Sequence, residues 1–278
     1  MSYAPIRVAY VIDKLHRAGT QVHLGQLASR LDRDRIQPQV HCLLEGGPIA
    51  DALRATGVAV EEWRLGRLYL PPGLLGLRRL GRRLRADGVD LVHTYLPSAN
   101  VFGSLAARLA GTPRVVTSRR DTGFSRNGRL RLLEEHFVNP RVDRVVAVTP
   151  SIAAATEREP GLLGKVVTIE NGIDAALWDP ERAPAQARAS FGIAANETAV
   201  AAIGHLSPVK GHDDLLEAMA RVAAQGCRIR LLIAGDGPLR GALEARARSL
   251  GLSGHTTFLG VRDDVRTLLS AVDIVALP

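Results

Sequence analysis

Short apolar runs alternate with longer segments of helical character along the whole chain. Most runs are β-branched and almost continuously apolar, as strands covered on both faces must be. Three of the intervening helix-like segments end on glycine, the usual residue after a helix. This alternation predicts an α/β fold with doubly wound, parallel, Rossmann-like sheets. The predicted strands are residues 6–12, 39–44, 89–95, 114–118, 143–148, 165–169, 198–204, 228–235, 255–260 and 273–278.

The alternation pauses at residues 171–197, where Pro180, Pro184 and two glycines stand without a strand pattern. We interpret this stretch as a connection between domains. One domain is therefore expected over residues 1–180 and a second over residues 181–278. The second domain has only about four predicted strands, and the last of them ends the 278-residue chain. The sequence thus predicts a second domain that is incomplete.

Basic residues are concentrated in the first half of the chain. Residues 1–150 contain 23 Lys and Arg against 13 Asp and Glu, whereas residues 151–278 contain 13 against 15. A basic half predicts an anionic partner, such as a phosphorylated substrate or an anionic membrane surface. Nucleic acid is not expected, because only 4% of residues are aromatic and the Arg-rich stretches lack interleaved aromatic side chains.

Residues 64–85 hold seven arginines together with several leucines. Leu74, Leu77 and Leu84 share one helical face. Two interpretations stay open: a basic amphipathic helix that docks on anionic lipid, or a helix that covers a sheet with a charged outer face. No apolar run reaches about 18 residues and the chain has two cysteines. We therefore expect a cytoplasmic protein, with peripheral attachment to the inner face of the membrane as an option.

Candidate binding residues follow the predicted strands, because ligands of doubly wound sheets bind beyond the carboxyl ends of strands. Gly19 and Thr20 follow the first strand and open a helix, whose amides can hold a phosphate or sugar hydroxyl. Alternatively, Gly19 only permits the turn and Thr20 caps the helix. Gly204 is expected to allow close backbone approach. Lys210, six residues later, can place its ammonium on a diphosphate or be a solvated loop residue.

Further candidates lie at other strand ends. Gly235, Asp236 and Gly237 predict a tight turn with amides exposed to a ligand, and Asn171 begins a tight turn with positive φ. Arg119 ends the strand at 114–118 and is expected to contact a phosphate or the acceptor of a reaction. The arginines that follow within residues 126–131 are interpreted as a solvated face.

Several classes of site are not supported by the sequence. The eight histidines show no metal-ligand spacing. The chain lacks G-x-x-x-x-G-K-[ST] and G-x-S-x-G motifs, which disfavours P-loop NTPases and α/β-hydrolases. The turn at Gly19 is not the G-x-G-x-x-G of dinucleotide-binding folds.

The segments in their order resemble the group 1 family of retaining glycosyltransferases, family GT4 with the GT-B fold of two Rossmann-like domains. The matching segments are RAGTQVHLGQLASRL, DLVHTYLPSANVFGSLAARLAG, VVAVTPS, TIENGID, AIGHLSPVKGHDDLLEAMARV, LLIAGDGPLRGALEARARSLGL and TFLGVRDDVRTLLSAVDIVALP. Together they cover essentially the whole chain.

The resemblance implies sugar transfer from a nucleotide-sugar donor to a saccharide or lipid-linked acceptor, with retention and without a metal or other cofactor. It implies an acceptor-side first domain and a donor-side second domain. Lys210 matches the family's phosphate-binding lysine, and its usual arginine partner is His205 here. The histidine that many members carry after the fourth strand falls at Arg119. His93 lies in the second matching segment and is a substrate-binding candidate.

The family's acidic E-x₇-E segment, which contacts the donor, would follow Pro278. Two other functions remain open at this point. One is a nucleotide-sugar epimerase of the same fold, which needs a base to abstract a proton; Asp236 is the one carboxylate in a suitable turn. The other is a non-catalytic module that binds a nucleotide sugar or a membrane.

Overall fold

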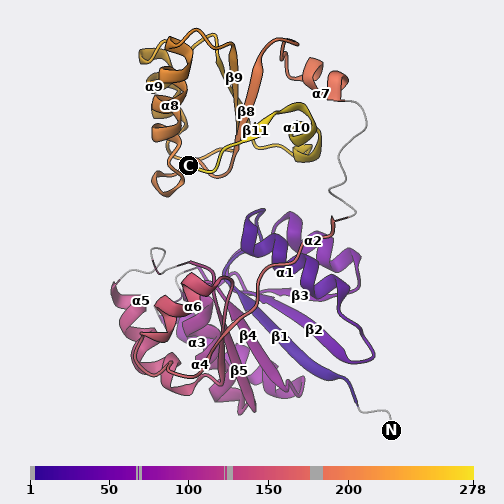
Figure 1. Ribbon diagram of the computed structural model, residues 1–278. Helices are drawn as coiled ribbons and strands as arrows, with labels where there is room; N and C mark the ends of the chain where they lie inside the picture. The colour runs from indigo at the N-terminus through magenta and orange to yellow at the C-terminus, as the bar shows by residue number, and fades with distance from the viewer. Residues whose placement is uncertain (1–3, 67, 69–70, 122, 124–127, 176–183) are drawn as a thin grey trace. The chain divides into compact units, whose positions relative to one another are not determined.

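The computed structural model describes residues 4–66, 68, 71–121, 123, 128–175 and 184–278. The chain forms two compact units, Met1–Gly172 and Ile173–Pro278 (Figure 1). Each unit is an α/β structure built on its own parallel sheet. The division falls at the beginning of the stretch that the sequence pattern marks as a connection; Pro180, within it, lies outside the described residues.

The sheet of the first unit has seven parallel strands in the order β3-β2-β1-β4-β5-β6-β7. Strand order reverses between β1 and its neighbour β4, which creates the switch point where ligands of such sheets bind. The strands are β1 (Ile6–Ile12), β2 (Ile36–Cys42), β3 (Ala59–Glu62), β4 (Leu91–Tyr95), β5 (Arg114–Arg119), β6 (Arg144–Ala147) and β7 (Val166–Thr168).

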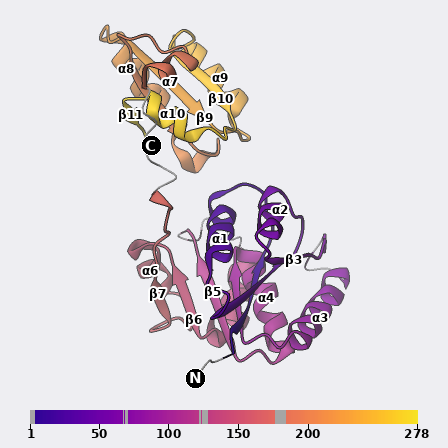
Figure 2. The same ribbon diagram turned by 90° about the vertical axis from the view of Figure 1, so that its right-hand side faces the viewer.

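Helices cover both faces of this sheet (Figure 2). On one face, α1 (Gly19–Arg30) and α2 (Pro48–Ala55) pack on a core that includes Tyr10, Leu24 and Leu53. On the other, α3 (Pro71–Ala86) and α4 (Pro97–Ala110) pack on a core that includes Val92 and Phe102. The remaining helices are α5 (Gly128–Leu133), the π-helix η1 (Glu134–Val138), the 3₁₀-helix η2 (Asn139–Arg141) and α6 (Pro150–Glu157).

The sheet of the second unit has four parallel strands in the order β10-β9-β8-β11, with its switch point between β8 and β11. Helices α8 and α9 lie on one face, and α7 and α10 on the other (Figure 1). The elements are α7 (Pro184–Ser190), β8 (Thr198–Ile203), the 3₁₀-helix η4 (Pro208–Lys210), α8 (His212–Ala224), β9 (Ile229–Ala234), α9 (Arg240–Ser249), β10 (Thr256–Gly260), α10 (Val265–Ala271) and β11 (Ile274–Val275).

The two doubly wound parallel sheets confirm the predicted fold class. The sequence pattern missed β3, which pairs with β2 at the edge of the first sheet. Its sequence, AVEE, ends on two glutamates, and an edge strand needs no continuous apolar run because its side chains remain partly exposed. Among the described residues, no helix combines the length and the apolar character needed to cross a bilayer.

Candidate functional site

The loops after β8 and β9 approach each other closely, and a glycine in the second loop allows this contact. Gly235 has φ +142°, and a Cβ atom there would lie 1.8 Å from the carbonyl oxygen of Gly204. Its amide donates to the carbonyl oxygen of Gly260 (2.7 Å). By contrast, nothing lies within 4 Å of a Cβ built on Gly204. The close contact between the two loops therefore requires glycine at position 235, whereas the space beside Gly204 is open.

Gly237 and His205 complete this turn. A Cβ on Gly237 would lie 2.5 Å from the carbonyl oxygen of Leu206 and 2.8 Å from the His205 ring. The Nδ1 of His205 lies 2.6 Å from the carbonyl oxygen of Asp236, so Nδ1 carries the proton and donates it. The hydrogen bond to Asp236 leaves Nε2 as the ring nitrogen that can contact another group. His205 therefore differs from an arginine in more than its charge, because one ring nitrogen is already used within the turn.

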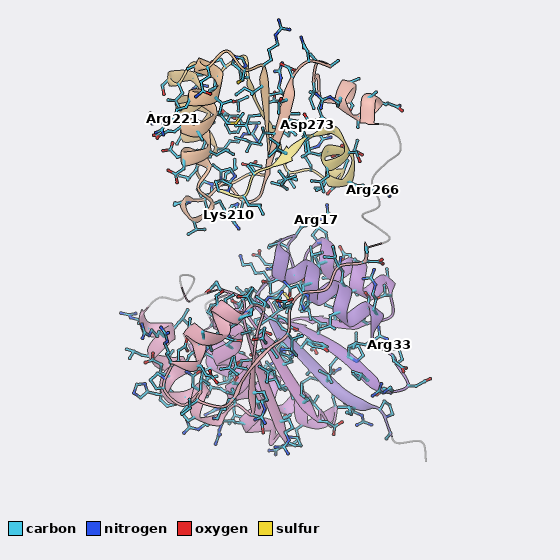
Figure 3. The ribbon with its side chains drawn as sticks, viewed as in Figure 1. Arg17, Arg33, Lys210, Arg221, Arg266 and Asp273 are labelled. Carbon is cyan, nitrogen blue, oxygen red and sulfur yellow. The ribbon has the colours of Figure 1, made fainter. Side chains whose placement is uncertain are left out.

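Lys210 ends η4, directly before the N-terminus of α8. Figure 3 shows it at the base of α8, with Arg221 farther along the same helix. Lys210 is exposed, and its ammonium forms no ion pair with any residue that the structure describes. Gly211, the helix N-cap, has φ +60°. The lysine and the first amides of α8 thus lie at the carboxyl end of β8, where a phosphate group binds in this topology.

His212, the first residue of α8, is buried beside this loop. Its Nδ1 has no hydrogen-bond partner within the described structure. Burial, and to a smaller extent the charge of Lys210, lower the pKa of His212. The ring is therefore neutral at pH 7, and it adds no positive charge to the Lys210 loop.

In the first unit, aromatic side chains gather where β1 and β4 end. The rings of His93 and Tyr95 lie 4.5 Å apart, and those of Tyr10 and His93 lie 5.7 Å apart. The Nε2 of His93 lies 2.9 Å from the hydroxyl of Ser118 on β5. Burial lowers the pKa of His93 to about 3, so this ring is neutral and acts only through hydrogen bonds and stacking. His93 thus lies on the central strand β4, beside the switch point of the first sheet.

Arg119 does not have the environment that the sequence analysis expected. Its side chain is 4% exposed and forms ion pairs with Glu134 (2.9 Å) and Glu159 (3.3 Å). A third contact joins its guanidinium to the side-chain oxygen of Asn139 (3.2 Å). A guanidinium already paired with two carboxylates is a structural group, so Arg119 does not fit the proposed contact with phosphate or acceptor. Sequence position alone could not reveal these partners, which lie 15 and 40 residues away.

The adjacent Arg120 lies on the opposite side of the chain and was not selected from the sequence. Its guanidinium carbon lies 5.8 Å from the centroid of the Tyr95 ring. The side chain is partly buried, and this burial lowers its pKa. No carboxylate in the described part of the chain pairs with it. The sequence signal was present, because neighbouring residues of an extended segment point to opposite faces and both arginines stood at the strand end.

Asp13, directly after β1, is a second site residue that sequence reasoning missed. Burial raises its pKa to about 7, although hydrogen bonds from Ser98 and Ala99 at the N-terminus of α4 partly offset this increase. One of its carboxyl oxygens has no partner among the described groups. Asp13 therefore changes protonation near neutral pH at the switch point of the first sheet.

The remaining candidates are exposed or only partly covered. Helix α1 begins at Gly19 with Ala18 as its N-cap and without a side-chain capping bond, so Thr20 does not cap it. Nothing lies within 4 Å of a Cβ built on Gly19, which leaves the first turn of α1 accessible. Asn171 is exposed after β7, but neither it nor Gly172 has a positive φ, so the expected turn is absent there. Arg126 lies outside the described residues.

Comparisons with known proteins decide the family. The profile of Glycosyltransferase Family 4 matches residues 17–177, and that of Glycosyl transferases group 1 matches residues 185–278. The chain belongs to these glycosyltransferases.

Named relatives of this glycosyltransferase come from bacteria. EpsF of Bacillus subtilis, assigned as a glycosyltransferase, is 29% identical over all of this chain and 74% of its own length. A D-inositol 3-phosphate glycosyltransferase of a Mycobacterium species is 29% identical over 68% of this chain and 46% of its own. A GDP-mannose-dependent phosphatidylinositol monomannoside mannosyltransferase of Mycobacterium tuberculosis is 27% identical over 94% of this chain and 69% of its own.

Solved structures share the GT-B fold of the glycosyltransferase. HepE of Anabaena in complex with UDP and glucose has a TM-score of 0.84 at 22% identity, over 98% of this chain and 74% of HepE. WaaG, a glycosyltransferase involved in lipopolysaccharide biosynthesis, has a TM-score of 0.70 at 17% identity, over 98% of this chain and 74% of WaaG.

Proposed function

We propose that this glycosyltransferase moves a sugar from a nucleotide-sugar donor to a saccharide or lipid-linked acceptor, with retention at the anomeric carbon and without a metal ion. The observation that carries the proposal is the exposed Lys210 at the N-terminus of α8, next to the turn that Gly235 and Gly237 make possible. Departure of a nucleoside diphosphate builds negative charge on its outer phosphate. The ammonium of Lys210 and the first amides of α8 would stabilise that charge.

The relatives support a nucleotide-sugar donor. The Mycobacterium tuberculosis mannosyltransferase is named as GDP-mannose-dependent, and HepE binds UDP and UDP-glucose. On this chain, the donor diphosphate would lie at the carboxyl end of β8, with His205, Asp236 and the turn amides around it. In this proposal Lys210 is the catalytic residue, and Arg119 has no part in the reaction.

The acceptor would bind to the first unit, at the carboxyl ends of β1, β4 and β5. The open first turn of α1 at Gly19 would add backbone donors for sugar hydroxyls. Asp13 would contact an acceptor hydroxyl in either of its protonation states.

A peripheral position on an anionic membrane is part of the proposal. In α3, Leu80 and Leu84 are buried on the sheet, which fits a helix that covers it. Leu75, however, is 61% exposed and lines a surface hollow of about 610 Å³ with exposed Leu109 of α4. The arginines that line the same hollow are Arg78, Arg79, Arg82 and Arg85. Exposed leucines within a basic rim match an anionic bilayer surface, consistent with a place on the inner face of the membrane.

The test is release of nucleoside diphosphate from a panel of UDP- and GDP-sugars in the presence of EDTA, with donor and product followed by NMR. We expect transfer by the original chain. Lys210→Ala should weaken nucleoside diphosphate affinity by about 1.5–3 kcal/mol, the scale of hydrogen bonds to charged groups. Arg221→Ala, which removes an exposed charge on α8, is the matched control and should leave the affinity unchanged. Epimerised donor without transfer, or equal affinities for both variants, would contradict the proposal.

A further inference from the structure

Arg120 occupies an unusual electrostatic position in the first unit. It is partly buried, yet no hydrogen bond or ion pair joins its guanidinium to any described residue. The neighbouring Asp121 directs a carboxyl oxygen to the amide of Gly123 (2.6 Å). The adjacent carboxylates Glu134 and Glu159 are taken by Arg119. A partly desolvated cation without a counter-charge is costly, and an anionic ligand would offset that cost.

Besides the adjacent Asp121 carboxylate, aromatic and imidazole rings surround Arg120. The charge of Arg120 contributes to lowering the pKa of both His23 and His93, after the larger effect of burial. The rings of His23 and His93 lie 6.5 Å and 4.5 Å from the Tyr95 ring that faces Arg120. Since His93 is neutral at pH 7, Arg120 supplies the local positive charge, and the imidazoles supply hydrogen-bonding groups.

An aromatic platform lies under the guanidinium. The Tyr95 ring faces Arg120 at 5.8 Å and contacts the rings of His93 (4.5 Å), Tyr10 (6.2 Å) and His23 (6.5 Å). These residues come from β1, α1 and β4, at the switch point of the sheet. A small pocket of about 20 Å³, whose lining includes Pro97, Ser118 and the carboxylate-bearing Asp121, opens beside Arg120. It has room for roughly one water molecule, so a larger ligand group would lie at its mouth.

We propose that Arg120, stacked on Tyr95 and flanked by His23 and His93, is an anion subsite that selects a phosphorylated saccharide acceptor. The inference rests on the proposed glycosyl transfer and adds the acceptor's chemical class. The guanidinium pairs with the phosphate through its fork of N–H donors.

The experiment is calorimetric titration of the full chain with glucose 6-phosphate, glucose and glucuronate, at saturating UDP so that the Lys210 site is filled. We expect glucose 6-phosphate to bind more tightly than either other probe. Arg120→Gln should weaken its binding by about tenfold or more, the scale of a charge-assisted contact, and Arg120→Lys should restore part of it. Arg158→Gln is the control, because this exposed arginine at the end of α6 belongs to the same unit.

Equal losses in Arg120→Gln and Arg158→Gln would overturn the subsite, since only net charge would then matter. Tighter binding of glucuronate than of glucose 6-phosphate would overturn the phosphate assignment. If UDP does not bind but glucose 6-phosphate binding still depends on Arg120, the proposed donor fails while the subsite stands. If UDP binds and Arg120→Gln binds glucose 6-phosphate like the original chain, the subsite alone fails.

Discussion

Two adjacent arginines show what a single sequence reveals at the scale of the residue. Their position after a predicted strand places residues 119 and 120 at the carboxyl end of β5. It could not tell which guanidinium is neutralised, because the partners of Arg119 are distant in sequence, on η1 and beyond α6. Asp13 was missed for the same reason: its raised pKa results from burial against α4, which no local motif announces.

Asp13 gives stability a pH dependence. The folded chain retains this proton up to about pH 7, whereas an unfolded chain releases it near its ordinary pKa of 3.8. Stability should therefore fall as the pH rises from about 4 to about 7, because the folded state binds more protons in that window. We expect the free energy of unfolding of Asp13→Asn, relative to that of the original chain, to be about 1–3 kcal/mol higher at pH 8 than at pH 5, because each pKa unit corresponds to about 1.4 kcal/mol.

Urea denaturation at the two pH values, followed by the fluorescence of Trp63 in the first unit, measures this change. Asp34→Asn is the control, because it removes the same charge from an exposed position. A difference between Asp13→Asn and the original chain that does not grow with pH would show that the carboxyl is not held in its protonated form.

At the scale of the element, apolar periodicity predicted ten strands and missed one edge strand, β3. The central parallel strands are apolar throughout, and the edge strand β7 keeps a β-branched run, VVT, whereas β3 has the sequence AVEE and lacks such a run. The sequence also marked Gly204, Gly235 and Gly237 as residues of the loops that follow the strands. Their separate roles depend on backbone atoms of another loop, so Gly204 and Gly235 could be distinguished only in three dimensions.

The two glycines form a matched pair of variants. Gly235→Ala places a Cβ against the carbonyl oxygen of Gly204 at a φ of +142°. We expect it to lower the stability of the second unit by about 2–4 kcal/mol, as backbone strain and overpacking combine, and to weaken UDP binding. Gly204→Ala should change both by little. Thermal unfolding and calorimetry measure the two quantities, and similar behaviour of both variants would contradict the assigned role of Gly235.

The proposed contact with an anionic membrane depends on the arginines of helix α3. Each basic residue near an anionic surface contributes about 1 kcal/mol, so Arg78→Gln with Arg82→Gln should lower vesicle binding by roughly 2 kcal/mol. Binding of the original chain should fade near about 0.5 M salt as screening increases. Sedimentation with phosphatidylserine vesicles is the assay, and Arg221→Gln with Arg228→Gln removes the same charge from the second unit. Equal effects of the two pairs, or equal binding to neutral vesicles, would rule out docking through α3.

At the scale of the whole molecule, the fold class followed from the sequence because strand–helix alternation admits few topologies. The ordered motifs then identified the glycosyltransferase family, and the matching profiles bear this out. The motifs mark the proposed donor loop, since it is a contiguous segment from Gly204 to Lys210. The proposed acceptor side combines β1, α1, β4 and the end of β5, and that assembly is visible only in the folded unit.

The central claim is transfer of a sugar from a nucleotide sugar with retention, and the configuration of the product tests it most directly. The chain would be incubated with α-linked UDP- and GDP-sugars, phosphorylated and lipid-linked acceptors and EDTA. The coupling of the new anomeric proton would then be measured by ¹H NMR. We expect an α-glycoside formed together with nucleoside diphosphate, and loss of both in Lys210→Ala. A β-glycoside, or transfer that proceeds unchanged without Lys210, would contradict it.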